Sequence, residues 1–349
     1  MNKNIIFRLD AGNKFGLGHL SRCLALAEEL KNNFSILFII KTDDKNKVND
    51  YLHLNCDSSI PGNLYFLNPE ISKKDDLSFI NKHVLELKGF LVLDHYSIDT
   101  AYQLHLKENN IKWFQFDSHA DMDFYGDLVL HASPAATKEL YKPLQKNHNT
   151  KFLLGTKYAI VSKRFSKKRK ELKARKYVEN ILICFGGGND KGATIKVLQM
   201  LNNDFFETFN VTIITSKKNT YYSDIKKFSN NYENLNLVLD STKIDEYMAL
   251  ADLGLISPGT LSYESTCVGL PMLLVNIADN QNINAKGWVE KGCAFSLGGI
   301  EELSDSTLNN NIRLLINNPE KLRKMSVNCF STVDGYGASR VKDEILSLL

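Results

Sequence analysis

The chain has 349 residues, of which 43% are hydrophobic, so it is long enough for two packed domains of ordinary size. Its 43 basic and 40 acidic residues leave a net charge of only +3, and this even balance does not indicate a nucleic-acid partner. The six cysteines have no zinc-ligand spacing, and no signal peptide or bilayer-length apolar run is present, so we expect a cytoplasmic protein without membrane insertion.

The first half alternates short apolar runs with helix-like segments. Such alternation is typical of a parallel sheet with helices on both faces. It predicts an N-terminal Rossmann-like domain over residues 1–160. The expected strands are 4–10, 34–42, 90–96, 111–117 and 127–133, and the expected helices include 21–30 and 99–108.

The pattern breaks over residues 161–177, a stretch dense in lysine and arginine. A basic stretch of this kind is most often a solvated linker or an exposed helix, and we predict a linker here.

Alternation then restarts, which predicts a second Rossmann-like domain over residues 178–349 that ends in a closing helix at 339–349. Its expected strands are 180–185, 209–216, 235–240, 252–256 and 271–277, with helices at 191–201, 244–251 and 261–270. The predicted fold class is therefore α/β, with two doubly wound domains that face each other across a cleft at the carboxyl ends of their strands.

The loop after the first strand reads DAGNKFGLGH, from Asp10 to His19. It contains G-x-G-x-x-small, but Asp10 at the strand end would repel a phosphate and the glycines are displaced from the dinucleotide fingerprint. We expect Gly16 and Gly18 to bend the backbone so that His19 projects into the cleft, where a neutral imidazole can take a proton from water. A histidine that only packs or caps a helix is the alternative.

A phosphate site is better supplied by SPGTLSYE in the second half, where a loop after a strand leads into a helix. Its backbone amides and hydroxyls suit a diphosphate at a positive helix end, and Glu264 could accept both hydroxyls of a ribose or merely complement the helix dipole. The glycine-rich turn at 186–190 offers further amides, and Asn280 and Gln281 are side-chain amides of the kind that read sugar hydroxyl and acetamido groups.

Together the motifs DAGNKFGLGHLSRCLALA, LVLDHY, ILICFGGGND, ADLGLISPGTLSYESTCVGLP, NIADNQ and VDGYGASRV resemble one family. These are the UDP-sugar hydrolases of pseudaminic acid biosynthesis, which act on UDP-2,4-diacetamido-2,4,6-trideoxy-β-L-altropyranose, and their spore-coat polysaccharide relatives. The resemblance implies a GT-B fold and cleavage of a UDP-sugar by water, with inversion and without a metal or other cofactor.

The resemblance also implies roles for single residues. His19 matches the catalytic base, Tyr96 and Asn280 match active-site positions, and Asp10 could orient His19 or the sugar. The UDP and substrate contacts that we predict are Gly16, Gly18, Gly187, Gly188, Ile244, Gly259, Thr260, Ser262, Glu264 and Gln281. The implied partners are a UDP-sugar and water, in a monomer or weak dimer.

The chain departs from the family at Gly12, where serine is common, at Ser257-Pro258, where a glycine is usual, and over residues 116–134. The resemblance thus implies the class of reaction, while the sugar stays open. A metal site at Asp117, His119, Asp121 and Asp123 is an alternative use of the last segment, but a polar loop between strands needs no metal, and we predict none. A GT-B glycosyltransferase and a nucleotide-sugar-binding protein without turnover are the rival functions.

Overall fold

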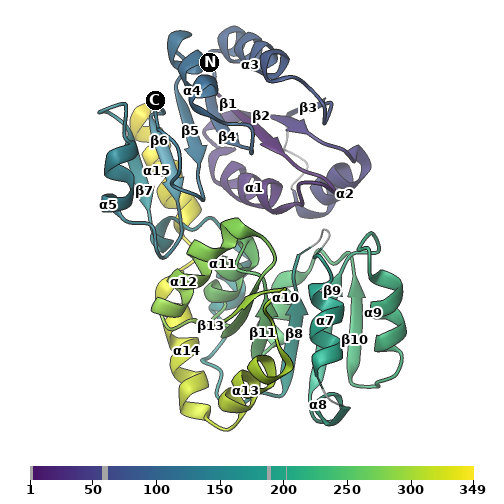
Figure 1. Ribbon diagram of the computed structural model, residues 1–349. Coiled ribbons are helices and arrows are strands. Elements are labelled where there is room, and N and C mark those ends of the chain that lie inside the picture. Colours follow the sequence, from purple (N-terminus) through teal and green to yellow (C-terminus); the bar gives the residue numbers. More distant parts are fainter. Residues whose placement is uncertain (1–2, 57–61, 187–189, 202) are drawn as a thin grey trace. The chain divides into compact units, whose positions relative to one another are not determined.

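The chain folds into two α/β units (Figure 1). The computed structural model describes residues 3–56, 62–186, 190–201 and 203–349. Unit 1 comprises Met1–Ser162 and Tyr336–Leu349, and unit 2 comprises Lys163–Gly335. The predicted α/β class with two Rossmann-like units is confirmed.

Unit 1 is built on a parallel sheet with the strand order β3-β2-β1-β4-β5-β6-β7. Its central strands are continuous apolar runs because helices cover both faces, and every residue of β4 is buried. The strands are β1 (Lys3–Asp10), β2 (Phe34–Lys41), β3 (Asn63–Leu67), β4 (Phe90–Asp94), β5 (Trp113–Phe116), β6 (Leu128–His131) and β7 (Lys151–Leu154).

Helices connect these strands, and four of the described helices of unit 1 begin at side-chain caps. Asp44, Ser72, Asp99 and Thr137 each accept a hydrogen bond from a backbone N–H in the first turn of the helix that follows. The helices are α1 (Gly18–Leu30), α2 (Lys45–Asn55), α3 (Lys73–Leu87), α4 (Thr100–Glu108), α5 (Lys138–Tyr141) and α15 (Gly337–Leu348), with 3₁₀ turns η1 (Lys142–Leu144) and η2 (Thr156–Tyr158).

Unit 2 repeats this plan around a parallel sheet with the order β10-β9-β8-β11-β12-β13. The strands are β8 (Asn180–Cys184), β9 (Asn210–Thr215), β10 (Leu235–Leu239), β11 (Leu253–Ile256), β12 (Met272–Asn276) and β13 (Ala294–Gly299). The helices are α6 (Lys163–Arg169), α7 (Ala193–Met200), α8 (Asn203–Thr208), α9 (Tyr222–Ser229), α10 (Ile244–Leu250), α11 (Thr260–Cys267), α12 (Asn282–Glu290), α13 (Asp305–Ile316) and α14 (Pro319–Thr332), with the 3₁₀ turn η3 (Asp279–Gln281).

Each sheet has a point where the strand order reverses. In unit 1 the chain moves from β1 to one side through β2 and later returns to pair β4 with β1. In unit 2 the same reversal lies between the paired strands β8 and β11. In open parallel sheets, ligands bind at the carboxyl ends of the strands beside such a reversal, so these two positions are where a site is expected in each unit.

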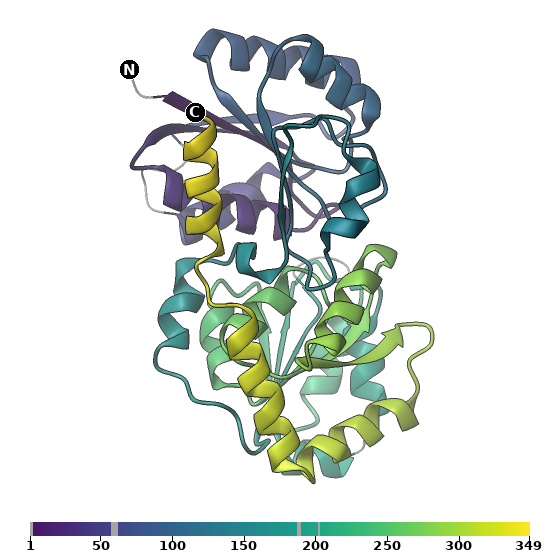
Figure 2. The same ribbon diagram turned by 90° about the vertical axis from the view of Figure 1, so that its left-hand side faces the viewer.

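The closing helix differs from the prediction, which placed it in the C-terminal domain. It is α15, and it belongs to unit 1, where Figure 2 shows its yellow ribbon beside the purple of the N-terminal segment. Its apolar side chains Ala338, Val341 and Ile345 are buried in the same core as Leu20 and Leu24 of α1. The apolar period of this helix predicts that one face is buried but does not tell which core receives it.

The basic segment is not a free linker either. It contains α6, and its two innermost arginines hold helix ends of unit 2. Arg169 donates to the carbonyls of Cys267, Phe330 and Val333, and the buried Arg175 donates to several more, including those of Met248 and Ala251. Arginine can satisfy the unpaired carbonyls at helix C-termini. The positive charge of the segment is thus partly structural.

No helix in the described part of the chain is both long and apolar enough to cross a lipid bilayer.

Candidate functional site

The loop that leads to His19 is bent by glycines at two points. Gly12 has a φ of 143° and Gly16 a φ of 74°, and the N–H of Gly12 donates to the carbonyl of Gly16 over 3.0 Å. A Cβ atom on Gly12 would lie 2.0 Å from Oδ1 of Asp43. That carboxylate accepts the backbone N–H groups of Asn13 and Lys14. Gly12, which departs from the family pattern, therefore leaves the space that Asp43 needs to close the loop.

His19 is the second residue of α1, directly after Gly18. Its side chain is 12% exposed, and Nδ1 lies 3.8 Å from Oδ1 of Asp94 at the end of β4. In the described part of the chain this Nδ1 atom is buried without a hydrogen-bond partner. Asp94 reaches this place because β4 pairs with β1, with Asp94 opposite Leu9. The reversal point of unit 1 thus brings the histidine and a carboxylate together.

Arg22 fixes the position of Asp94. It lies one helical turn after His19, and its Nε and Nη2 atoms donate to the two oxygens of Asp94. The thiol of Cys23 also contacts this carboxylate, at 3.5 Å. A forked guanidinium–carboxylate pair has one preferred geometry, so Asp94 is held facing His19.

Burial favours the neutral imidazole of His19. Burial is the largest influence and lowers its pKa from the usual 6.5, the Asp94 carboxylate acts in the opposite direction, and the Arg22 guanidinium lowers it again. The Arg22 guanidinium also keeps the pKa of Asp94 below its ordinary value in spite of burial. At neutral pH the pair is therefore an uncharged imidazole beside a carboxylate, which is the state that a general base requires.

Sequence reasoning named His19 but missed Asp94 and Arg22. The available signal was an arginine three residues after the histidine on the same helix face, together with an aspartate that ends an apolar strand.

Tyr96 follows two residues after Asp94 and reaches the same place. Its ring centroid lies 4.9 Å from that of His19, and the residue is 57% exposed. His95 between them points into unit 1, where burial holds its pKa well below the usual range. The structure therefore brings the predicted Tyr96 beside the predicted base.

Asp10, which we predict to orient His19 or the sugar, lies at the end of β1. It is fully buried, its Oδ1 accepts from Arg8 over 2.8 Å, and its Oδ2 lies 3.6 Å from Nζ of Lys41. Arg8 in turn donates both Nε and Nη2 to Asp76. Asp94 is the carboxylate that lies within 4 Å of His19, and the charge of Asp10 also raises the pKa of His19. A role of Asp10 in orienting His19 or the sugar stays a prediction.

The loop from β11 to α11 lies at the reversal point of unit 2. Gly259 precedes the first residue of the helix, Thr260, and no side chain caps this helix start. A Cβ atom on Gly259 would lie 3.7 Å from Nε2 of Gln281, so the two predicted contacts are neighbours. Amides at an uncapped helix start beside a side-chain amide suit an anion.

Ser262 does not fit the predicted role of phosphate ligand. It is fully buried, its hydroxyl donates to the carbonyl of Gly259 over 2.6 Å, and it accepts from Nε1 of Trp288 over 2.8 Å. The hydroxyl of Ser262 is thus used inside the protein, between the carbonyl of Gly259 and the indole of Trp288. Ser262 holds the loop to α12 instead.

Glu264 is buried on the same helix, and burial raises its pKa to about 8. The Arg164 guanidinium opposes this shift and the Asp245 carboxylate adds to it. Arg164 lies 3.8 Å from Asp245 and donates to the carbonyl of Thr242. The predicted Ile244 is the first residue of α10 and adjoins this cluster in sequence. Glu264 is therefore largely protonated at neutral pH, able both to donate and to accept a hydrogen bond.

Gln281 ends η3, and its Oε1 accepts the N–H of Ile277 over 2.9 Å, so its Nε2 group is the one on the Gly259 side. Asn280 lies in the same turn. Gly187 and Gly188 lie outside the described residues. Asp190, which follows them, accepts from Gly192 and Thr194 at the start of α7.

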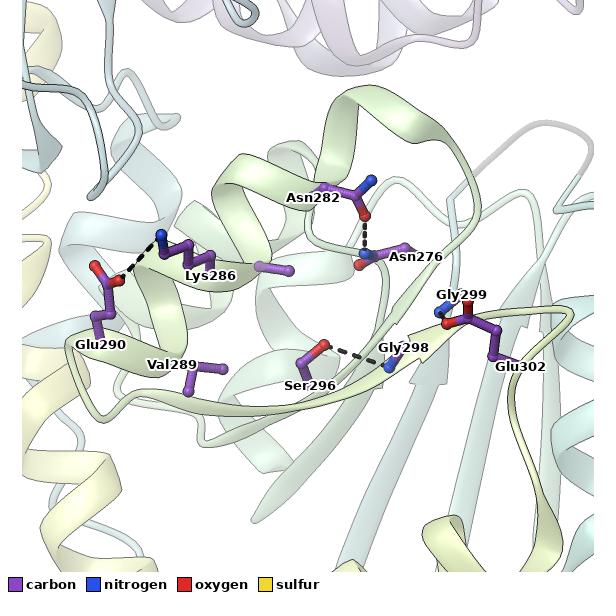
Figure 3. A pocket seen from close by; sticks show the side chains of 10 residues that line it. Asn276, Asn282, Lys286, Val289, Glu290, Ser296, Gly298, Gly299 and Glu302 are labelled. Atoms are coloured by element: carbon purple, nitrogen blue, oxygen red, sulfur yellow. Dashed lines mark hydrogen bonds and ion pairs between the residues drawn. The ribbon is translucent and has the colours of Figure 1, made fainter. Parts of the chain in front are cut away.

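A separate hollow of about 550 Å³ lies between α12 and β13 of unit 2 (Figure 3). It is lined by polar side chains such as Asn276, Asn282 and Glu302, and Lys286 and Glu290 form an ion pair at its rim. None of the residues predicted for the site lines it.

The residues considered for a metal are used in other ways. Asp117 accepts from backbone amides and from Tyr141, and Asp123 lies 3.3 Å from Nζ of Lys146. In the ranges that the structure describes, no group of three or more His, Cys, Asp or Glu side chains is placed to hold a metal ion.

The chain has relatives in several organisms, although no family model matches it. An uncharacterized protein of Methanocaldococcus jannaschii is 27% identical over 277 residues, which are 76% of this chain and 54% of that protein, so the chain spans about half the length of this relative. The spore coat polysaccharide biosynthesis protein SpsG of Bacillus subtilis is 24% identical over 86% of this chain and 85% of its own length. The UDP-2,4-diacetamido-2,4,6-trideoxy-β-L-altropyranose hydrolase of Campylobacter jejuni is 24% identical over 82% of this chain and 97% of its own.

Solved structures with the same fold match nearly the whole chain. The UDP complex of Staphylococcus aureus MnaA has a TM-score of 0.70 at 12% identity and covers 99% of this chain and 98% of its own. The UDP-GlcNAc 2-epimerase of Neisseria meningitidis has a TM-score of 0.69 at 13% identity, with 99% and 100% covered. MurG of Acinetobacter baumannii has a TM-score of 0.65 at 17% identity, with 99% of both chains covered. The chain therefore has the GT-B fold, and in sequence it resembles the hydrolase and SpsG across both units.

Proposed function

We propose that the protein is an enzyme that hydrolyses a UDP-2,4-diacetamido-2,4,6-trideoxyhexose to UDP and the free sugar, with inversion at the anomeric carbon. The observation that carries the proposal is the arrangement of His19, Asp94 and Arg22 at the reversal point of unit 1. The similarity to the Campylobacter jejuni hydrolase over 97% of that protein supports the choice of substrate class.

His19 acts as the general base. Its Nδ1 atom is buried and faces Asp94, so Nε2 is the nitrogen that takes the proton. As a water oxygen forms its bond to the anomeric carbon, the bond from that carbon to the phosphate oxygen breaks and the water proton moves to His19. The Asp94 carboxylate then stabilises the imidazolium. Attack from the face opposite the leaving group inverts the configuration.

Unit 2 binds the UDP portion of the substrate in this proposal. The amides of Gly259 and Thr260 and the dipole of α11 stabilise the charge that collects on the diphosphate. Glu264 contacts the ribose, and Gln281 and Asn280 contact the sugar or the phosphate, with Tyr96 beside the base. UDP is a good leaving group that needs little protonation, so neither a pair of glycosidase carboxylates nor a metal is required. The product is a free diacetamido sugar for nonulosonic acid biosynthesis.

The test is to incubate the purified protein with UDP-2,4-diacetamido-2,4,6-trideoxyhexoses in buffer without acceptor, and to measure UDP and reducing sugar together. Equal release of both, lost in His19→Asn, supports the proposal. UDP release only after an acceptor is added would identify a glycosyltransferase, and binding without release would identify a nucleotide-sugar-binding protein. Full UDP release by His19→Asn contradicts the assignment of the base.

A further inference from the structure

The loop that follows β5 is held in a single shape by a buried carboxylate. Asp117 accepts the backbone N–H of His119 at Oδ1 and that of Ala120 at Oδ2, over 3.3 and 2.9 Å. Ala120 has a φ of 54°, a left-handed conformation that residues other than glycine seldom adopt. The result is a short loop whose tip, Ser118 and His119, is the more exposed part, while Asp117 is buried.

A buried chain of hydrogen bonds continues inward from Asp117. The hydroxyl of Tyr141 donates to Oδ2 of Asp117, and Nδ1 of His131 lies 2.6 Å from the same hydroxyl oxygen. Because the only hydroxyl proton is used on Asp117, the oxygen must accept a hydrogen bond from the Nδ1–H of His131. Nδ1 of His131 thus carries a proton, and burial, which lowers the pKa of His131 to about 4, keeps the ring neutral at pH 7.

This chain lies along the same sheet edge as the proposed base. β5 is next to β4, and the ring of Phe116, the last residue of β5, lies 4.6 Å from Cζ of Arg22. Asp117 donates its N–H to Leu130 of β6 over 2.8 Å. Neighbouring strands are about 4.8 Å apart. The tip follows β5, which is the neighbour of β4, the strand that ends at Asp94.

Three buried polar side chains, Asp117, Tyr141 and His131, hold the backbone of this loop. The two polar side chains at its tip are more exposed, and Oγ of Ser118 lies 3.1 Å from Nδ1 of His119. A hydroxyl and an imidazole each offer a donor and an acceptor. An acetamido group presents the complementary pair, an N–H donor and a carbonyl acceptor.

We propose that Ser118 and His119 recognise an acetamido substituent on the part of the sugar ring away from the anomeric carbon, and that Asp117, Tyr141 and His131 are positioning residues for this tip. The inference rests on the proposed function for the identity of the ligand as a UDP-sugar. It adds the residues that distinguish one such sugar from another, in the segment where the chain departs from the family pattern.

The test uses two ligands that differ at a single position, UDP-2,4-diacetamido-2,4,6-trideoxyhexose and the analogue with a hydroxyl at C4. Binding is measured by calorimetry in a His19→Asn background, so that turnover is not needed. We expect His119→Ala to weaken binding of the diacetamido ligand about 10-fold and binding of the hydroxyl analogue less than about twofold. Ser118→Ala acts in the same direction, and His53→Ala, an exposed histidine of α2, is the control that changes neither.

Tyr141→Phe tests the positioning role because it keeps the ring and removes the hydroxyl. We expect Tyr141→Phe to weaken binding of the diacetamido ligand about 3- to 10-fold while the affinity for UDP alone does not change. Nitrogen-15 spectra of the histidines provide a second readout, which should show His131 with its proton on Nδ1 and lose that signature in Tyr141→Phe. A proton on Nε2 of His131 in the parent protein contradicts the buried chain.

The outcomes separate this inference from the hydrolase proposal. Release of UDP by the parent protein, with equal losses for both ligands in His119→Ala, refutes the recognition tip and leaves hydrolysis standing. Selective loss of binding without any release by the parent protein refutes hydrolysis and leaves the tip standing. If the parent protein neither binds the diacetamido ligand nor releases UDP from it, both proposals are wrong.

Discussion

Replacing Asp94 with asparagine removes the charge that faces His19 while keeping the shape of the side chain. Asp94 raises the pKa of His19, so the variant should have an even lower histidine pKa and a base that is neutral at every pH near 7. The rate should nevertheless fall, because the imidazolium formed as water attacks has lost its counter-charge.

The size of the effect follows from the distance. At 3.8 Å and an effective dielectric constant of roughly 20, a carboxylate stabilises an imidazolium by about 4 kcal/mol. Arg22, bound to the same carboxylate, cancels part of this. A net of about 2 kcal/mol corresponds to a decrease of roughly 30-fold in kcat.

The assay is acceptor-free UDP release across pH, with unfolding followed in parallel. Asp94→Asn also leaves the partly buried Arg22 without its partner, which should cost about 2 kcal/mol of stability. The double variant Arg22→Met/Asp94→Asn removes both charges and should recover most of that stability without recovering kcat. A folded Asp94→Asn protein with the kcat of the parent would refute the role of this carboxylate.

Four further outcomes are expected. The pKa of His19 is lowered from 6.5, so the decrease of kcat/KM with falling pH should be centred below pH 6.5, and a decrease centred above 6.5 contradicts the assignment. His131 binds a proton near pH 6.5 in the unfolded chain but only near about 4 in the folded protein, so stability should be lost as pH falls through this window. In urea titration, about 3 kcal/mol of this loss should be absent in a folded His131→Phe variant. Glu264 should have the opposite effect on the pH dependence of stability. Its folded pKa of about 8 exceeds the unfolded value of 4.5, so stability falls as pH rises through this range to 8, and Glu264→Gln should remove that slope in thermal melts. The same variant should weaken UDP binding about 10-fold by calorimetry. Arg175→Ala should lower the free energy of unfolding, measured by urea titration, by about 3 kcal/mol, against no change for the neighbouring Lys176→Ala.

The local elements were predictable from the sequence. Apolar runs such as those of β4 and β11 predict buried parallel strands, and the spacing of these runs predicts the helices between them. The glycine loop before His19 and the loop before Thr260 were recognisable for the same reason, since each joins such a strand to a helix. These signals are local, and local sequence carries them.

The partners of the site residues were not predictable. Asp94 lies 72 residues from Arg22 along the chain, and only the pairing of β4 with β1 brings the two together. Ser262 looks like a phosphate ligand until the indole of Trp288 is seen to bind its hydroxyl. The pKa of Glu264 depends on burial, which a helical spacing does not reveal.

The sequence by itself thus determined the α/β class, the two repeated units and the two loops that carry His19 and Gly259. Only the tertiary structure decided that α15 completes the core of unit 1, that Asp94 faces the base, and that Asp43 requires Gly12. The physical reason is that hydrophobic periodicity reports how much of a segment is buried, whereas the identity of each contact depends on which distant strands pair and which side chains fill the space between them.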